Sequence, residues 1–196
     1  YDVTTGKIKE VFSLPFHEAV IEWGRGSSDT HFAYPKASYA LEGYLYEITG
    51  GTLKRLPLSG FGFSAQVNED IIVYNTIENQ TPTTHIYDRN SGVKQALNAP
   101  ILLEKCFLPV TGLIFVCGFE AVKMPYEFPD FWYRGDVSFK DSLLAISAKD
   151  FVSEELINTF NESGREIDIT ELKAGTSGTA LYFTNKNDNT LWMYEI

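Results

Sequence analysis

A short phrase recurs five times along this chain of 196 residues: an apolar run that ends in Tyr and an acidic residue, followed by a polar turn. Successive copies are spaced 45, 41, 58 and 49 residues apart. Repeats of about 40 to 50 residues are typical of propeller blades or of helical arrays, so the period restricts the fold to these two architectures. The phrase itself is interpreted as scaffold. Its copies stand at Tyr1-Asp2, Tyr46-Glu47, Tyr87-Asp88, the degenerate Ala145-Ile146 and Tyr194-Glu195.

Strand-like runs distinguish between the two architectures. Four apolar runs occur in each full unit, bounded by Gly, Asn, Asp and Pro, and the i, i+3, i+4 spacing of an amphipathic helix is missing. The sequence therefore predicts an all-β protein, a β-propeller of four-stranded antiparallel blades, with about four blades in this chain. The units cover residues 13–57, 58–98, 102–158 and 165–196. The predicted strands are 18–23, 31–34, 44–48, 53–56, 61–65, 71–74, 84–87, 93–97, 105–108, 113–117, 142–146, 154–157, 167–172, 180–184 and 190–194.

Residues 1–196 are interpreted as a single β-propeller domain or as the C-terminal part of one. The fourth unit stops after its third strand, whereas residues 1–12 have the pattern of the end of a blade. They would either supply the missing outer strand of a closed four-bladed ring or end an earlier blade of a larger ring. The start in the middle of a phrase, without an initiator Met, favours the larger ring and a longer protein.

Charge and hydropathy argue against two classes of partner. The net charge is −10 and the isoelectric point is about 4.7, so a nucleic-acid backbone or an anionic membrane surface is an unfavourable partner. No apolar run approaches the roughly 20 residues that a transmembrane helix needs. We expect no nucleic-acid binding and no direct membrane insertion in this segment, and any membrane anchor would lie upstream of it.

The two cysteines indicate a cellular compartment. A two-residue turn at Thr111-Gly112 places Cys106 opposite Cys117 on adjacent strands, where Cα atoms lie about 4.5 to 5.5 Å apart, within reach of a disulfide. The alternative is a pair of buried thiols in a cytosolic core. The in-register placement favours the disulfide, which indicates an extracytoplasmic location: cell surface, periplasm-like or secreted.

The C-terminal half resembles a group of bacterial sequences. Its features are the Cys106-to-Cys117 hairpin, the segment 131–143 with Trp132-Tyr133-Arg134-Gly135, and the ending Thr190-Leu191-Trp192. Residues 104–196 are similar to uncharacterised WD40-like or TolB-like β-propeller proteins of candidate-phyla (Parcubacteria-type) bacteria. The resemblance implies an exported propeller, often tethered by an N-terminal membrane helix, and no known activity. The chain departs from that pattern at Leu144-Ala145-Ile146, where a Trp is expected.

The longest interval between copies of the phrase contains an insertion, residues 119–139, between the second and third strands of the third unit. Loops on this face of a rigid scaffold commonly carry binding sites, and Trp, Tyr and Arg are frequent in protein hot spots and sugar platforms. The alternative is a loop that folds back as a plug, with Trp132 buried. The candidate binding residues are Tyr126, Asp130, Trp132, Tyr133 and Arg134.

Catalytic chemistry has little support in the sequence. The three histidines are far apart, no Gly-x-Ser-x-Gly motif is present, and residues 185–189 lack the Gly and the closing Glu of a calcium loop. We expect no catalytic residues, no metal and no cofactor. The leading hypothesis is a non-catalytic extracytoplasmic scaffold that binds a protein or a surface glycan. The alternatives are a propeller hydrolase or lyase that acts on a glycan or peptide, and a regulatory or gating propeller of a larger multidomain protein.

Overall fold

The computed structural model describes residues 6, 13–23, 29–79, 81–97, 99–124 and 127–196, whose strands form four antiparallel sheets. The first sheet contains β1 Ala19–Glu22, β2 Thr30–Pro35, β3 Glu42–Thr49 and β4 Thr52–Phe61. The second contains β5 Ser64–Val67, β6 Ile71–Glu78, β7 Thr81–Asp88 and β8 Lys94–Leu97. The third contains β9 Cys106–Phe107, β10 Ile114–Phe119, β11 Ser142–Ser147 and β12 Ser153–Asn158. The fourth contains β13 Ile169–Ala174, β14 Ala180–Asn185 and β15 Thr190–Glu195.

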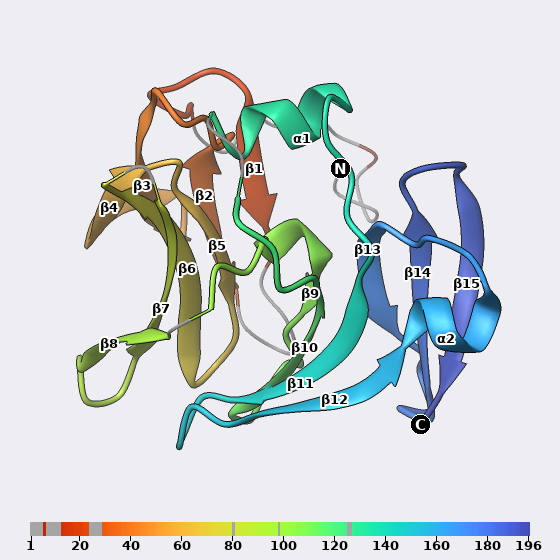
Figure 1. Cartoon of the computed structure of the whole chain (residues 1–196). Coiled ribbons are helices and arrows are strands. Elements are labelled where there is room, and N and C mark those ends of the chain that lie inside the picture. The colour runs from red at the N-terminus through yellow and green to blue at the C-terminus, as the bar shows by residue number, and fades with distance from the viewer. Residues whose placement is uncertain (1–5, 7–12, 24–28, 80, 98, 125–126) are drawn as a thin grey trace.

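The sheets are propeller blades, as the repeat predicted. Strands follow one another in chain order within each sheet, and the sheets follow one another around an arc from blade one (β1–β4) to blade four (β13–β15) (Figure 1). The Tyr-acid phrase lies in the third strand of its blade at Tyr46, Tyr87 and Tyr194, and it ends that strand in β7 and β15. Blade four has three strands among the described residues, as predicted. The role expected for residues 1–12 falls, apart from Gly6, outside the described part of the chain.

The core lies between the blades rather than within any one of them. Blades one and two share a cluster that includes Phe32, Leu45, Phe63 and Tyr74. Blades two and three share a second, and blades three and four share a third around Ile169. Strands in the middle of the arc are therefore covered on both faces, which explains the continuous apolar runs in their sequences.

The cysteine hairpin has the predicted register. Cys106 of β9 is paired with Cys117 of β10, and Phe107 with Val116. The Cα atoms of the cysteines are 4.0 Å apart and their sulfurs form a disulfide, so no free cysteine remains in the chain. The predicted disulfide is confirmed.

Within the described part of the chain, helical structure is limited to three short elements: η1 Leu103–Lys105, α1 Asp130–Arg134 and α2 Thr159–Ser163. The Asn158 side chain accepts a hydrogen bond from the backbone N–H of Asn161 at the start of α2, and Gly164 ends that helix in the left-handed region with φ of 67°. None of the helices that the structure describes is long or apolar enough to cross a membrane.

Candidate functional site

The insertion of blade three lies where the sequence predicted it, between β10 and β11, and it carries α1 (Figure 1). Gly135 ends this helix with φ of 80°, a conformation that glycine adopts without strain. Asp130 in the first turn and Arg134 in the last turn each complement the helix dipole. The single turn of α1 therefore presents neighbouring side chains in different directions.

Trp132 points into the protein and anchors α1 to the core. Its side chain is 3% exposed and packs with Leu102, Phe128 and Phe139. The indole Nε1 donates to both carboxylate oxygens of Asp168, at 2.9 and 3.1 Å. This burial fits the plug alternative for Trp132, so this residue holds the insertion rather than offering an exposed aromatic surface.

A buried ionic cluster lies beside Trp132. Lys105 Nζ is 2.6 Å from Asp141 Oδ2 and 2.5 Å from Asp168 Oδ1, and all three side chains are at most 3% exposed. Two carboxylates thus share one ammonium group. Burial raises the pKa of Asp141 to about 6, and the negative charge of Asp168 also raises it. The positive charge of Lys105 lowers this pKa but does not cancel the effect of burial.

The sequence did not reveal this carboxylate pair. Each acid stands directly before a strand, Asp141 before β11 and Asp168 before β13, a signal too common to select them. Paired carboxylates are the chemistry that the hydrolase alternative requires. The adjoining cavity, bordered by Lys105 and Asp141, has a volume of about 10 Å³, enough for about one water molecule. This cavity is too small for a sugar or a peptide beside Asp141, and Asp168 of the cluster accepts the indole N–H of Trp132 in α1.

Three other side chains of α1, those of Tyr133, Asp130 and Arg134, have partners outside the cluster. The Tyr133 hydroxyl donates to Glu104 of η1, and burial raises the pKa of both groups. Asp130 Oδ2 accepts a 2.7 Å hydrogen bond from the backbone N–H of Tyr39, in the loop after β2. Arg134 is half-exposed and forms an ion pair with Asp136 at 2.9 Å. Hydrogen bonds thus connect α1 to blade one, to η1 and to the start of blade four.

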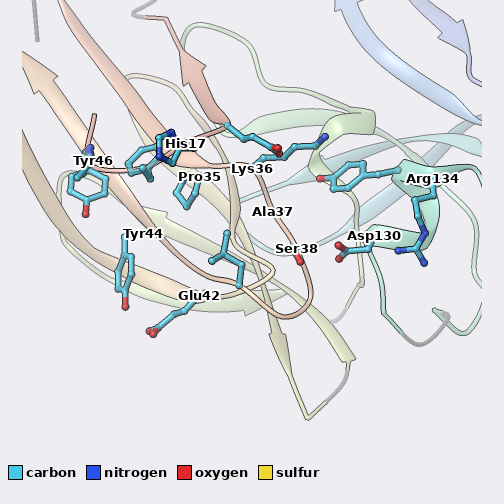
Figure 2. A pocket seen from close by; sticks show the side chains of 15 residues that line it. His17, Pro35, Lys36, Ala37, Ser38, Glu42, Tyr44, Tyr46, Asp130 and Arg134 are labelled. Atoms are coloured by element: carbon cyan, nitrogen blue, oxygen red, sulfur yellow. The ribbon is translucent and has the colours of Figure 1, made fainter. Parts of the chain in front are cut away.

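A groove of about 790 Å³ lies between α1 and blade one. Figure 2 shows the side chains that line it, from Tyr44 and Tyr46 of β3 on one side to Asp130 and Arg134 of α1 on the other. The described residues that line the groove are Pro15, Phe16, His17, Glu18, Pro35, Lys36, Ala37, Ser38, Leu41, Glu42, Tyr44, Tyr46, Asp130, Tyr133 and Arg134.

The structure brings three predicted binding residues, Asp130, Tyr133 and Arg134, to this groove. Trp132 is buried beneath them, and Tyr126 lies outside the described residues. Sequence reasoning missed the whole wall that blade one contributes. Tyr46 belongs to the repeated phrase that we interpreted as scaffold, and it also lines the groove. The one sequence signal for a role of Tyr46 in the groove is that Tyr44 and Tyr46, two residues apart, lie on the same face of the strand.

Charge and aromatic contacts shape the wall formed by blade one. The Arg55 guanidinium carbon lies 3.6 Å from the centre of the Tyr44 ring, and the Phe16 ring centre is 5.5 Å from that of Tyr46. A hydrogen bond with Glu42 raises the pKa of the Tyr44 phenol. Both tyrosine rings are therefore held in place by neighbours. Among the described residues, no group of three or more His, Cys, Asp or Glu side chains could hold a metal ion.

Comparisons with known proteins identify the architecture. No protein-family model and no curated protein matches the chain. Among solved structures, TolB from Acinetobacter baumannii superposes with a TM-score of 0.53 at 11% identity, over 84% of this chain and 38% of TolB. The chain is built as a β-propeller. TolB thus supports the fold assigned from the blades, and at this identity it supports the fold alone.

Two other propeller-containing proteins show weaker similarity. The Swd1 β-propeller domain of Myceliophteria thermophila gives a TM-score of 0.44 at 15% identity, over 92% of this chain and 67% of that domain. The tricorn protease gives a TM-score of 0.40 at 8% identity, over 90% of this chain and 25% of the protease chain. This chain therefore spans well under half the length of TolB and of the tricorn protease.

Proposed function

We propose that this chain is a non-catalytic interaction scaffold outside the cytoplasm, which binds a protein or a surface glycan in the groove between α1 and blade one. The observation that carries the proposal is the groove itself. Its volume of about 790 Å³ lies within the range of small-ligand pockets, and aromatic and charged side chains line it. Asp130, Tyr133 and Arg134 contact the partner from α1, and Tyr44 and Tyr46 contact it from β3. Tyr126 remains a predicted contact.

The rigidity of the site supports a binding role. The hydrogen bonds of Trp132, Tyr133 and Asp130 hold α1 to three separate parts of the arc. Binding to a site that is already ordered loses less conformational entropy than binding to a mobile loop. The buried cluster of Lys105, Asp141 and Asp168 thus contributes to binding indirectly, because it supports Trp132.

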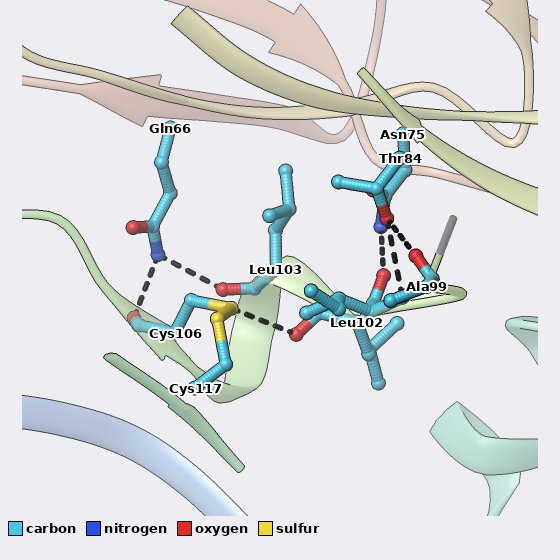
Figure 3. Close-up of a disulfide and its surroundings, with 9 residues drawn as sticks. Gln66, Asn75, Thr84, Ala99, Leu102, Leu103, Cys106 and Cys117 are labelled. Carbon is cyan, nitrogen blue, oxygen red and sulfur yellow. Dashed lines mark hydrogen bonds between the residues drawn. A yellow bond between two sulfur atoms is a disulfide. The ribbon is translucent and has the colours of Figure 1, made fainter. Parts of the chain in front are cut away.

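The disulfide supports the extracytoplasmic location. Cys106 and Cys117 are almost completely buried, and Gln66 of blade two donates to the carbonyl oxygens of Leu103 and Cys106 at 2.9 and 2.8 Å beside them (Figure 3). Disulfides persist in oxidising compartments and are rare in the cytosol. Mass spectrometry of the native protein after alkylation without reduction tests this argument, since two alkylated thiols would remove it.

Binding at the groove is tested with ligands selected from a phage-displayed peptide library and from a glycan array. We expect Tyr44→Ala to weaken the selected ligands about tenfold, because a buried aromatic contact contributes on the order of 1 to 2 kcal/mol to binding. Tyr182→Ala is the matched control, since Tyr182 is a partly exposed strand tyrosine of blade four, away from the groove. Equal affinity of every selected ligand for the wild type and Tyr44→Ala would refute the siting.

A further inference from the structure

The charges that line the groove do not balance. Glu18, Glu42 and Asp130 face two cations, Lys36 and Arg134. Both cations are already engaged. Arg134 lies 2.9 Å from Asp136 and 3.7 Å from Glu127, and Lys36 Nζ lies 5.2 Å from the centre of the Tyr133 ring.

Neither glutamate has a described cation at ion-pair distance, although Glu42 shares a hydrogen bond with the hydroxyl of Tyr44. Glu18 and Glu42 are exposed, and neither forms an ion pair with a described residue. Carboxylates without a counter-charge create a negative potential, which a concave surface concentrates. The groove therefore has an excess of negative charge that favours a cationic ligand.

Two aromatic rings follow Glu42 along β3. Glu42, Tyr44 and Tyr46 project from the same face of β3, so successive side chains are about 6.6 to 6.8 Å apart. Lys and Arg bind to aromatic faces within about 6 Å, and the attraction adds to that of a nearby carboxylate. Arg55 of this chain already occupies one face of Tyr44 in this way, which leaves the other face of Tyr44 and the ring of Tyr46 for a ligand. The same interval separates alternate side chains of an extended peptide. An extended chain with basic residues at every second position thus matches the wall in both charge and spacing.

We infer that the groove binds an extended basic peptide segment, with Lys or Arg side chains at alternate positions between the glutamates and the tyrosines. The inference rests on the proposed function and selects a protein segment rather than a glycan as the ligand. A neutral glycan would leave Glu18 and Glu42 without a counter-charge. Asn and Gln side chains supply both a donor and an acceptor for the hydroxyl groups of a glycan. The described lining of the groove includes neither residue type.

The test measures fluorescence anisotropy with a labelled peptide of alternating Arg and Ser, roughly eight residues long or about 27 Å when extended. A Glu-Ser peptide of equal length and chitohexaose, a neutral oligosaccharide, are the comparison probes. We expect the Arg-Ser peptide to bind and the other two not to bind. The double variant Glu18→Gln/Glu42→Gln should weaken the Arg-Ser peptide about fivefold, as the loss of two exposed ion pairs predicts.

The control variant changes the net charge by the same amount elsewhere. Glu154→Gln/Glu155→Gln alters two exposed acids of β12 in blade three, and we expect its affinity to stay within about twofold of the wild type. Equal weakening by both double variants would mean diffuse attraction to an acidic protein and would overturn the inference. Binding of chitohexaose without the peptide, lost in Tyr44→Ala, would also overturn it and leave the proposed function standing. Circular dichroism confirms that each variant is folded.

Discussion

Replacement of Lys105 by Met is expected to destabilise the protein strongly. The substitution removes the one ammonium group between Asp141 and Asp168, whose oxygens lie 2.6 and 2.5 Å from it, and keeps a side chain of similar length. Two carboxylates then remain buried side by side, with Trp132 and the backbone N–H of Ile169 as donors. The remaining hydrogen bonds cannot compensate for the lost opposite charge.

The expected loss in the free energy of unfolding is about 3 to 5 kcal/mol, the usual cost of removing one partner from a buried ion pair. A domain has on the order of 5 to 15 kcal/mol of stability, so this loss is a large fraction of the total. It should be smaller near pH 5 than near pH 8, because one of the two unpaired carboxylates can take up a proton in acid. This pH dependence separates lost charge from lost packing.

Urea denaturation followed by tryptophan fluorescence measures the loss at both pH values. Lys140→Met is the matched control, since Lys140 Nζ also lies 2.5 Å from a carboxylate, that of Glu166, and both of these side chains are more than half exposed. An exposed pair contributes about 0 to 1 kcal/mol. If Lys105→Met costs no more than Lys140→Met, the buried cluster does not support α1 and this reasoning is wrong.

Three further predictions concern stability. Burial raises the pKa of Asp141 to about 6 from 3.8, so the protonated Asp141 stabilises the fold fully below pH 4. About 3 kcal/mol of the free energy of unfolding is lost as the pH rises through 6. Urea denaturation of the wild type and of Asp141→Asn at several pH values measures this loss. Removal of the disulfide by Cys106→Ala/Cys117→Ala should cost about 3 kcal/mol for a separation of 11 residues, measured as the shift of the urea curve, and an unchanged curve would contradict it. Gly118→Ala should cost about 1 to 3 kcal/mol in the same assay, since its Cβ would lie 2.7 Å from Ile169 Cβ; a stable variant would mean that blades three and four can separate slightly.

The architecture was predictable because it depends on local patterns. The strand runs, the turn residues and the period each have a fixed relation to blade structure, and the observed strands overlap all fifteen predicted ones. The pairing of Cys106 with Cys117 was predicted correctly, but the two-residue turn at Thr111-Gly112 was wrong: pairing ends at Phe107 and Val116, and a longer connection joins the two strands. The strands differ from the prediction at their ends: β4 extends to Phe61, which the sequence pattern places in the next strand.

The candidate site was only half predictable. Asp130, Tyr133 and Arg134 were found because an insertion interrupts the period, which is a property of the sequence. The sequence of β3 keeps the regular period of the repeat. Nothing in it therefore identified Tyr44 or Tyr46 as binding residues. Burial decided the role of Trp132, and burial depends on which distant side chains surround it.

The sequence by itself determined the blades, their register, the disulfide hairpin and the position of the insertion, because each follows from residues close together in the chain. Tertiary structure decided the rest. Only the curvature of the arc places Tyr39, Glu104 and Asp168 around the single turn of α1, although they are far apart in sequence. The groove and the buried ionic cluster on the two sides of that turn exist because packed blades set these distances, and no local pattern records them.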